Sequence, residues 1–198
     1  MAFGDWLRQM RSYDRVAGIG AIARRYLAMN AFDGVVTIIG VITGSYAAGV
    51  SSGHTVVVTG ASTAVAMSVG GVWGAWLSES AERKRDVEKL ERHMITDLGQ
   101  SRIGRASRAA VVVVVLVEAI TPLIAATPAV LPFLFASHLP DIRWAYGLGV
   151  LMALLTLAAV GIFLGRISKQ GLVGFTLKTV LAGMVALGLG LLLPGPTP

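Results

Sequence analysis

The sequence predicts an all-α membrane protein whose single domain, residues 1–198, crosses the bilayer five times. Of the 198 residues, 55% are hydrophobic and only 14% are charged, whereas soluble domains carry about 25% charged residues. Five apolar stretches are each long enough for the roughly 20 residues that cross the hydrocarbon core as a helix. None shows the period-2 alternation of a membrane β-strand. Most lysines and arginines fall on one side of these stretches, as the positive-inside rule describes.

The N-terminal segment, about residues 5–29, is expected to form an amphipathic helix on the membrane surface. Apolar and basic side chains recur there at helical spacing, with Trp6, Met10, Tyr13 and Ala17 on one side and Arg8, Arg11 and Arg15 on the other. Such a helix lies in the interface with its apolar side toward the acyl chains. We expect it to anchor the first span.

The spans themselves are expected at about residues 32–52, 55–77, 109–136, 145–165 and 171–194. Residues 78–108 form a cytoplasmic linker, and the second span is expected to continue into it as a helix. The i,i+4 spacing of Glu79 and Arg83 supports an exposed helix there. We expect a turn at residues 99–104, and the third span should be kinked or broken by its late prolines, which are Pro122, Pro128 and Pro132.

The distribution of basic residues predicts the orientation. Five arginines precede the first span, and eight lysines and arginines lie between Arg83 and Arg108, whereas the opposite side holds only Arg143. This places the N-terminus in the cytosol and the C-terminus outside. The net charge of +6 is thereby explained by topology, so we expect no nucleic-acid partner. No organelle address is visible, so a prokaryotic plasma membrane is expected.

Two carboxylates within the apolar stretches are functional candidates, because ionisable residues inside a membrane are rare and costly. Asp33 stands at the beginning of the first span, where it serves either an ion or a helix N-cap. Glu118 follows Arg108 by ten residues, about 15 Å along a helix. It needs a proton, a cation or a hydrogen-bond partner at that depth.

A second acidic group lies on the cytoplasmic extension. Glu79, Glu82 and Asp86 share one face of the expected helix. They form either an ordinary solvated surface or a cluster that draws cations to a pore entrance.

Small residues recur every four positions in two rows. One row is Gly40, Gly44 and Ala48, and the other is Gly60, Ala64 and Ser68. Small-xxx-small rows allow membrane helices to approach closely. They predict either tight internal packing or the interface of a dimer.

Several of these stretches resemble one family of membrane proteins. The first span, "DGVVTIIGVITG", resembles the first transmembrane signature of the vacuolar iron transporter family, which includes the yeast calcium-cross-complementer and plant nodulin-21-like proteins. The matching residues are Asp33, Gly34, Val36, Thr37, Gly40, Val41 and Gly44. "ASTAVAMSVGG" resembles the second span of that family, with its methionine at Met67. Looser likenesses occur in the third and fifth spans.

The resemblance implies a homodimer in which Asp33 and Met67 line a path between the subunits. A divalent ion, Fe²⁺ or Mn²⁺, would cross there in exchange for protons. A carboxylate supplies charge, while a thioether favours softer ions over Mg²⁺ or Ca²⁺. The expected ion-binding residues are Asp33, Met67, Glu118, Glu79 and Glu82, and no resident cofactor is expected.

The chain departs from the family pattern at two points. The glutamate expected in the second span is Gly71 here, and Glu118 is a candidate to replace it. The linker is also too short and too basic for the cytoplasmic metal-binding bundle of the family. A membrane scaffold or partner subunit without transport is therefore an alternative function. We expect no enzyme, because no nucleophile–base set is visible and cysteine is absent.

Overall fold

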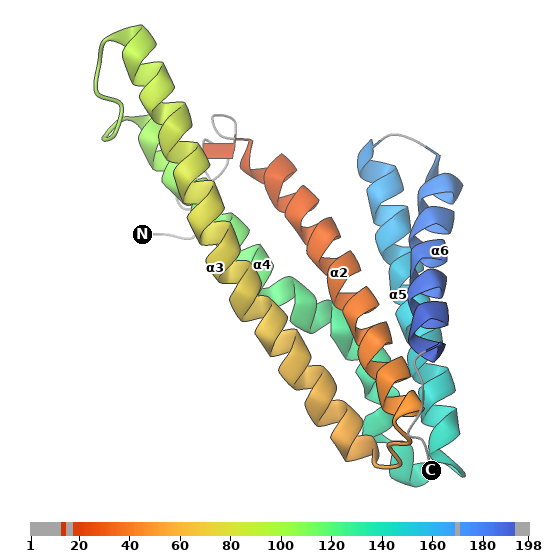
Figure 1. Cartoon of the computed structure of the whole chain (residues 1–198). Helices are drawn as coiled ribbons and strands as arrows, with labels where there is room; N and C mark the ends of the chain where they lie inside the picture. The colour runs from red at the N-terminus through yellow and green to blue at the C-terminus, as the bar shows by residue number, and fades with distance from the viewer. Residues whose placement is uncertain (1–12, 15–17, 169–170, 193–198) are drawn as a thin grey trace, which may run out of the picture. The chain divides into compact units, whose positions relative to one another are not determined.

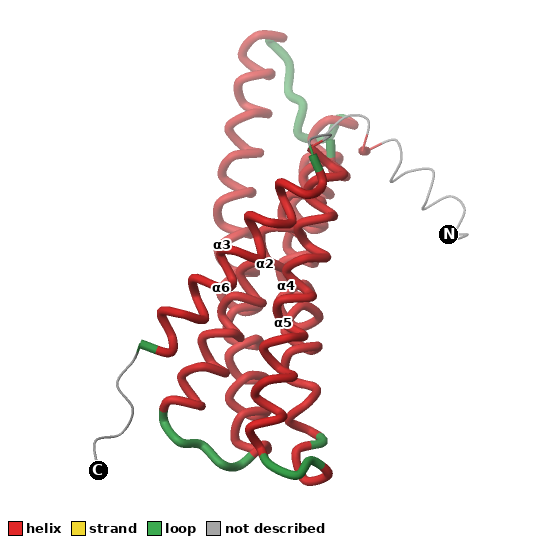
Figure 2. The backbone as a smooth tube through the Cα atoms, turned by 90° about the vertical axis from the view of Figure 1, so that its right-hand side faces the viewer, coloured by secondary structure: helices red, strands yellow, loops and turns green. Residues whose placement is uncertain are grey.

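Five long helices make up most of the described part of the chain, which in this computed structural model comprises residues 13–14, 18–168 and 171–192. They are α2 (Ile19–Ala47), α3 (Gly53–Met94), α4 (Arg102–Leu134), α5 (Ile142–Ser168) and α6 (Leu172–Leu191), with a 3₁₀ helix, η1 (Ala136–His138), before α5 (Figure 1). The described residues contain no strand (Figure 2). All five are long and apolar enough to cross a membrane. This confirms the all-helical class and fits a multi-pass membrane protein.

The helix boundaries differ from the expected ones mainly at the ends toward the basic residues. α2 begins at Ile19, so residues 19–29 are continuous with the first span and do not form a separate surface helix. Residues 5–12 and 15–17 of that expected helix lie outside the described residues. α3 continues without a break to Met94, as expected for the extension. Its 42 residues span about 63 Å, twice the thickness of the hydrocarbon core.

The prolines of α4 do not break the helix, which excludes the expected break and leaves the expected kink as a prediction. α4 is continuous from Arg102 to Leu134 and contains Pro122, Pro128 and Pro132. Membrane helices tolerate proline where neighbouring groups compensate for the lost hydrogen bond. One neighbour is close here, because a Cβ atom added at Gly34 of α2 would lie 3.2 Å from Cα of Pro122.

Side-chain caps fix the starts of two helices. The turn before α4 occupies residues 95–101 rather than 99–104. Ser101 Oγ accepts hydrogen bonds from the backbone N–H groups of Ile103 (3.2 Å) and Gly104 (3.3 Å), which is the N-cap arrangement. Asp141 Oδ1 does the same for the N–H of Arg143 at the start of α5, at 2.9 Å.

The chain divides into two compact units, each of which is described by itself. The first unit contains the described residues up to Leu27 together with Val69–Ala119. The second unit contains Ala28–Ser68 and the described residues from Ile120 onward.

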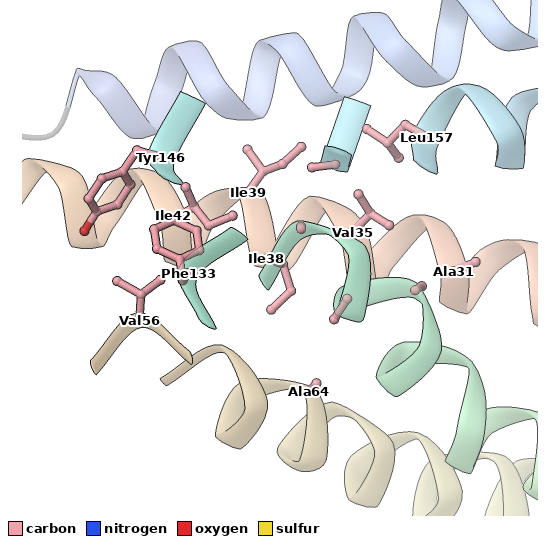
Figure 3. Close-up of a cluster of buried hydrophobic side chains, with 14 of the residues drawn as sticks. Ala31, Val35, Ile38, Ile39, Ile42, Val56, Ala64, Phe133, Tyr146 and Leu157 are labelled. Carbon is pink, nitrogen blue, oxygen red and sulfur yellow. The ribbon is translucent and has the colours of Figure 1, made fainter. Parts of the chain in front are cut away.

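The second unit has a continuous apolar core (Figure 3). One face of α2 contributes side chains to this core at helical spacing, and α3, α4 and α5 contribute the rest. The fully buried side chains of the core include Val35, Ile38, Ile39, Ile42, Val56, Phe133 and Leu157. The rings of Phe133 and Tyr146 pack edge to face, with their centroids 5.0 Å apart. Tyr146 then donates its hydroxyl to the carbonyl of Val50 at 2.9 Å. This hydrogen bond ties the turn between α2 and α3 to α5.

Candidate functional site

Asp33 lies at the midpoint of α2 and not at the start of a helix. Because α2 runs from Ile19 to Ala47, about 21 Å of helix separate Asp33 from either end. The alternative role of Asp33 as an N-cap is therefore wrong, since an N-cap residue precedes the first helical turn. The side chain is exposed. It makes no hydrogen bond or ion pair with any residue that the structure describes.

Asp33 shares an open face of α2 with two glycines. Gly40 and Gly44 follow it by seven and eleven residues, close to two and three turns of 3.6 residues. A Cβ atom added at either glycine would meet nothing within 4 Å in the described chain. We call Asp33, Gly40 and Gly44 the open stripe of α2. Its two glycines are therefore not in close contact with any described residue.

The other row of small residues is used inside the second unit. Gly60, Ala64 and Ser68 are all buried. A Cβ atom at Gly60 would lie 3.1 Å from Cγ2 of Val130 and 3.8 Å from Cδ1 of Ile38. Of the two roles that the sequence left open, internal packing applies to this row.

Met67 and Asp33 belong to the second unit, whereas Glu118, Glu79 and Glu82 belong to the first. Met67 is half-buried on α3, next to buried Ser68. Among the described residues, no group of three or more His, Cys, Asp or Glu side chains is arranged to hold a metal ion.

Glu118 lies directly against Gly71. Its side chain is 7% exposed. A Cβ atom added at Gly71 would collide with Glu118 Oε2, and it would lie 3.4 Å from Cδ of the same side chain. Within the described part of the chain the carboxylate has no hydrogen bond or ion pair. The Glu118 side chain thus fills the space beside Gly71.

Glu79 is separated from the other two acidic residues of the α3 extension. It is 4% exposed and has two partners: Tyr26 donates its hydroxyl to Oε1 at 2.8 Å, and Nε of Arg83 lies 3.4 Å from Oε2. Glu82 and Asp86 are exposed. The three carboxylates therefore do not form one surface cluster, because Glu79 is buried and charge-compensated.

Tyr26 is the partner that sequence reasoning missed. It stands 53 residues from Glu79, and no local spacing signals such a pair. Arg83, in contrast, was predicted from its i,i+4 spacing and lies where expected. The signal for Tyr26 is indirect, because a buried glutamate near the end of a span requires a donor from another helix.

The chain is similar to an archaeal protein. No protein-family model matches it, and no solved structure matches it. It is 25% identical over 173 residues to an uncharacterised protein of Methanocaldococcus jannaschii, covering 86% of this chain and 87% of that protein. The two chains thus correspond over most of their lengths.

Proposed function

We propose that this protein is a homodimeric transporter of divalent transition-metal ions, Fe²⁺ or Mn²⁺, that exchanges them for protons. The observation that carries the proposal is the placement of Asp33. It stands in the middle of an apolar helix, on an open stripe, without a partner in the described chain. A charge within an apolar membrane helix is costly unless another group compensates it. A cation would do so, and one cation held between two copies of the stripe would compensate both carboxylates.

The open stripe supports a dimer with α2 at the contact. Membrane helices approach closely where small residues repeat, because little side chain separates their backbones. Gly40 and Gly44 provide such a surface on the side that carries Asp33. In the proposed dimer the two Asp33 side chains and the two Met67 side chains line the ion path, as the resemblance to the vacuolar iron transporter family implies.

Glu118 supplies the second carboxylate of the proposed mechanism. It is buried beside Gly71, unpaired in the described chain, and therefore suited to bind either a proton or a cation. We propose that it replaces the second-span glutamate that this chain lacks. The carboxylates provide charge for the ion, while the thioether of Met67 favours Fe²⁺ over Mg²⁺ and Ca²⁺.

The proposed topology follows the asymmetry of lysine and arginine, with the N-terminus in the cytosol and the C-terminus outside, in a prokaryotic plasma membrane. A tag placed after Pro198 should then be accessible from outside intact cells, and one placed before Met1 should not. The reverse pattern would overturn the orientation.

The decisive experiment measures Fe²⁺ uptake into proteoliposomes that contain an internal pH dye. Wild type should move metal inward and protons outward, and Asp33→Asn should lose most of both fluxes. Asp97→Asn is the matched control, because Asp97 is exposed in a loop and only accepts a hydrogen bond from the Gly99 N–H, which an amide oxygen also accepts. Wild-type protein without flux would favour a scaffold, and active Asp33→Asn would refute the assigned site.

A further inference from the structure

A groove of about 670 Å³ lies within the first unit, between the extension of α3 and the beginning of α4. It is formed by parts of the chain that the proposed ion path does not use. One end is lined by apolar side chains and the other by basic ones. The groove is thus amphipathic along its length.

The apolar end is a wall of hydrocarbon side chains. α4 contributes Val112, Val115 and Leu116, and α3 contributes Trp76. Val112, Leu116 and Trp76 are about half exposed, so the wall is accessible from the side. From Arg108 to Leu116 the wall follows α4 for about 12 Å, which is close to the roughly 15 Å of one hydrocarbon leaflet.

The basic end carries Lys84, Arg83 and Arg108. Arg83 is engaged by Glu79, whereas the Lys84 side chain is 79% exposed, with its Nζ 3.9 Å from Oε1 of Glu88. Arg108 extends toward the loop and donates to the carbonyl of Gly99 at 3.1 Å. Lys84 and Arg108 therefore retain N–H donors for an anion at this end.

Two acidic residues, Glu88 and Glu91, also line the groove. Their contacts with other groups reduce their electrostatic repulsion of an anion. Glu91 Oε1 accepts a hydrogen bond from the backbone N–H of Leu98 at 2.9 Å. Glu88 Oε1 lies 3.9 Å from Nζ of Lys84. Arg83 is already paired with Glu79, so the N–H donors of Lys84 and Arg108, and not an excess of positive charge, would hold a negative ligand here.

An unused hydroxyl lies beside the basic end. Ser107 lines the groove and is 9% exposed. It makes no hydrogen bond with any described side chain or backbone group. The hydroxyl lines the groove and has no partner among the described residues, so it can form a hydrogen bond with a ligand there.

We propose that this groove binds one anionic phospholipid of the leaflet on the basic side. Its phosphate would lie at Lys84, Arg108 and the Ser107 hydroxyl, and one acyl chain would follow the wall of Val112, Val115 and Leu116. Basic pockets between membrane helices bind anionic headgroups in this way. The proposal is independent of metal transport, since it uses neither Asp33 nor Glu118.

Trp76 allows a direct test, because it lines the apolar end. The other three tryptophans, Trp6, Trp73 and Trp144, are replaced by phenylalanine in the full-length protein. Trp76 fluorescence is then measured in bilayers that contain brominated phosphatidylglycerol or brominated phosphatidylcholine at equal mole fraction. We expect half-maximal quenching by brominated phosphatidylglycerol at a mole fraction at least threefold lower than that needed for brominated phosphatidylcholine.

Variants separate a specific site from general attraction of the membrane surface. Lys84→Gln and Arg108→Gln should remove the preference for phosphatidylglycerol. Lys89→Gln is the matched control on the same helix, since Lys89 is exposed and does not line the groove. A protein that keeps only Trp144, on α5, should show no preference. Equal quenching by both lipids, or a preference that survives in Lys84→Gln and Arg108→Gln, would overturn the proposal.

Discussion

Replacing Gly71 by alanine is expected to displace the Glu118 carboxylate without unfolding the protein. The added methyl group collides with Glu118 Oε2, and its other near neighbours are Cδ at 3.4 Å and Cβ at 3.7 Å of the same side chain. All three atoms belong to a flexible side chain and none to the backbone. The carboxylate must move by about 1 Å to reach an ordinary contact distance.

The effect on stability should be small because two terms oppose each other. Pushing a side chain off its preferred rotamer costs about 0.5–1.5 kcal/mol. Replacing glycine by alanine within a helix gains about 0.5–1 kcal/mol. We therefore expect the free energy of unfolding to change by less than about 1 kcal/mol. If Glu118 takes part in transport, a barrier raised by about 1.4 kcal/mol would slow uptake tenfold.

The assay compares initial rates of Fe²⁺ uptake into proteoliposomes for Gly71→Ala, Glu118→Gln and wild type. Both variants should be slowed, while SDS-induced unfolding followed by circular dichroism should show a native midpoint for Gly71→Ala. Gly70→Ala and Gly74→Ala are matched controls on the same helix, because an added Cβ at either position meets nothing within 4 Å. Wild-type uptake by Gly71→Ala, or equal slowing by Gly70→Ala, would refute the role of the Gly71–Glu118 contact.

Three further predictions concern the dimer, the ion and the buried glutamate. Light scattering in detergent should show that Gly44→Leu shifts the protein from dimer toward monomer. The control Gly60→Leu should leave the dimer intact but lower the free energy of unfolding by about 1–3 kcal/mol through overpacking. An unchanged dimer in Gly44→Leu would show that the open stripe is not part of the interface. Met67→Leu keeps the volume and apolarity of the side chain but removes the sulfur, so Fe²⁺ uptake should fall while thermal stability in detergent stays native. Unchanged uptake would exclude the thioether as a ligand. Tyr26→Phe removes a hydrogen-bond donor to the buried Glu79 carboxylate, so the free energy of unfolding, measured by SDS titration, should fall by about 1 kcal/mol. No change in stability would show that this hydrogen bond is not formed in the membrane.

The helices could be predicted from the sequence because hydropathy over 20 residues depends only on composition. Their ends could not, because polar residues continue a helix as readily as they terminate it. α2 extends back through Arg24 and Arg25 to Ile19, so the basic residues mark the edge of the apolar stretch and not the edge of the helix. For the same reason Asp33 was expected at the beginning of a helix and lies in its middle. The prolines of α4 do not end the helix either, since neighbouring groups can compensate for them.

The candidate site could be predicted only where its contacts are local. The Glu79–Arg83 pair follows from i,i+4 geometry and is present. The Tyr26–Glu79 hydrogen bond and the contact between Gly71 and Glu118 join different helices, so they depend on packing that no single stretch encodes. The same holds for the two rows of small residues. Identical spacing places Gly60 against Val130 and leaves Gly40 and Gly44 open.

The unbroken course of α3 limits how this chain can change in length. Gly71 must face Glu118 while Glu79, eight residues later, must reach Tyr26. Each residue added to a helix turns everything beyond it by about 100°. A single insertion or deletion between these positions would therefore carry Glu79 away from its donor. Among homologues, gaps in an alignment should fall in the loop at residues 95–101, and a gap between positions 71 and 79 would indicate a misaligned pair or a different buried network.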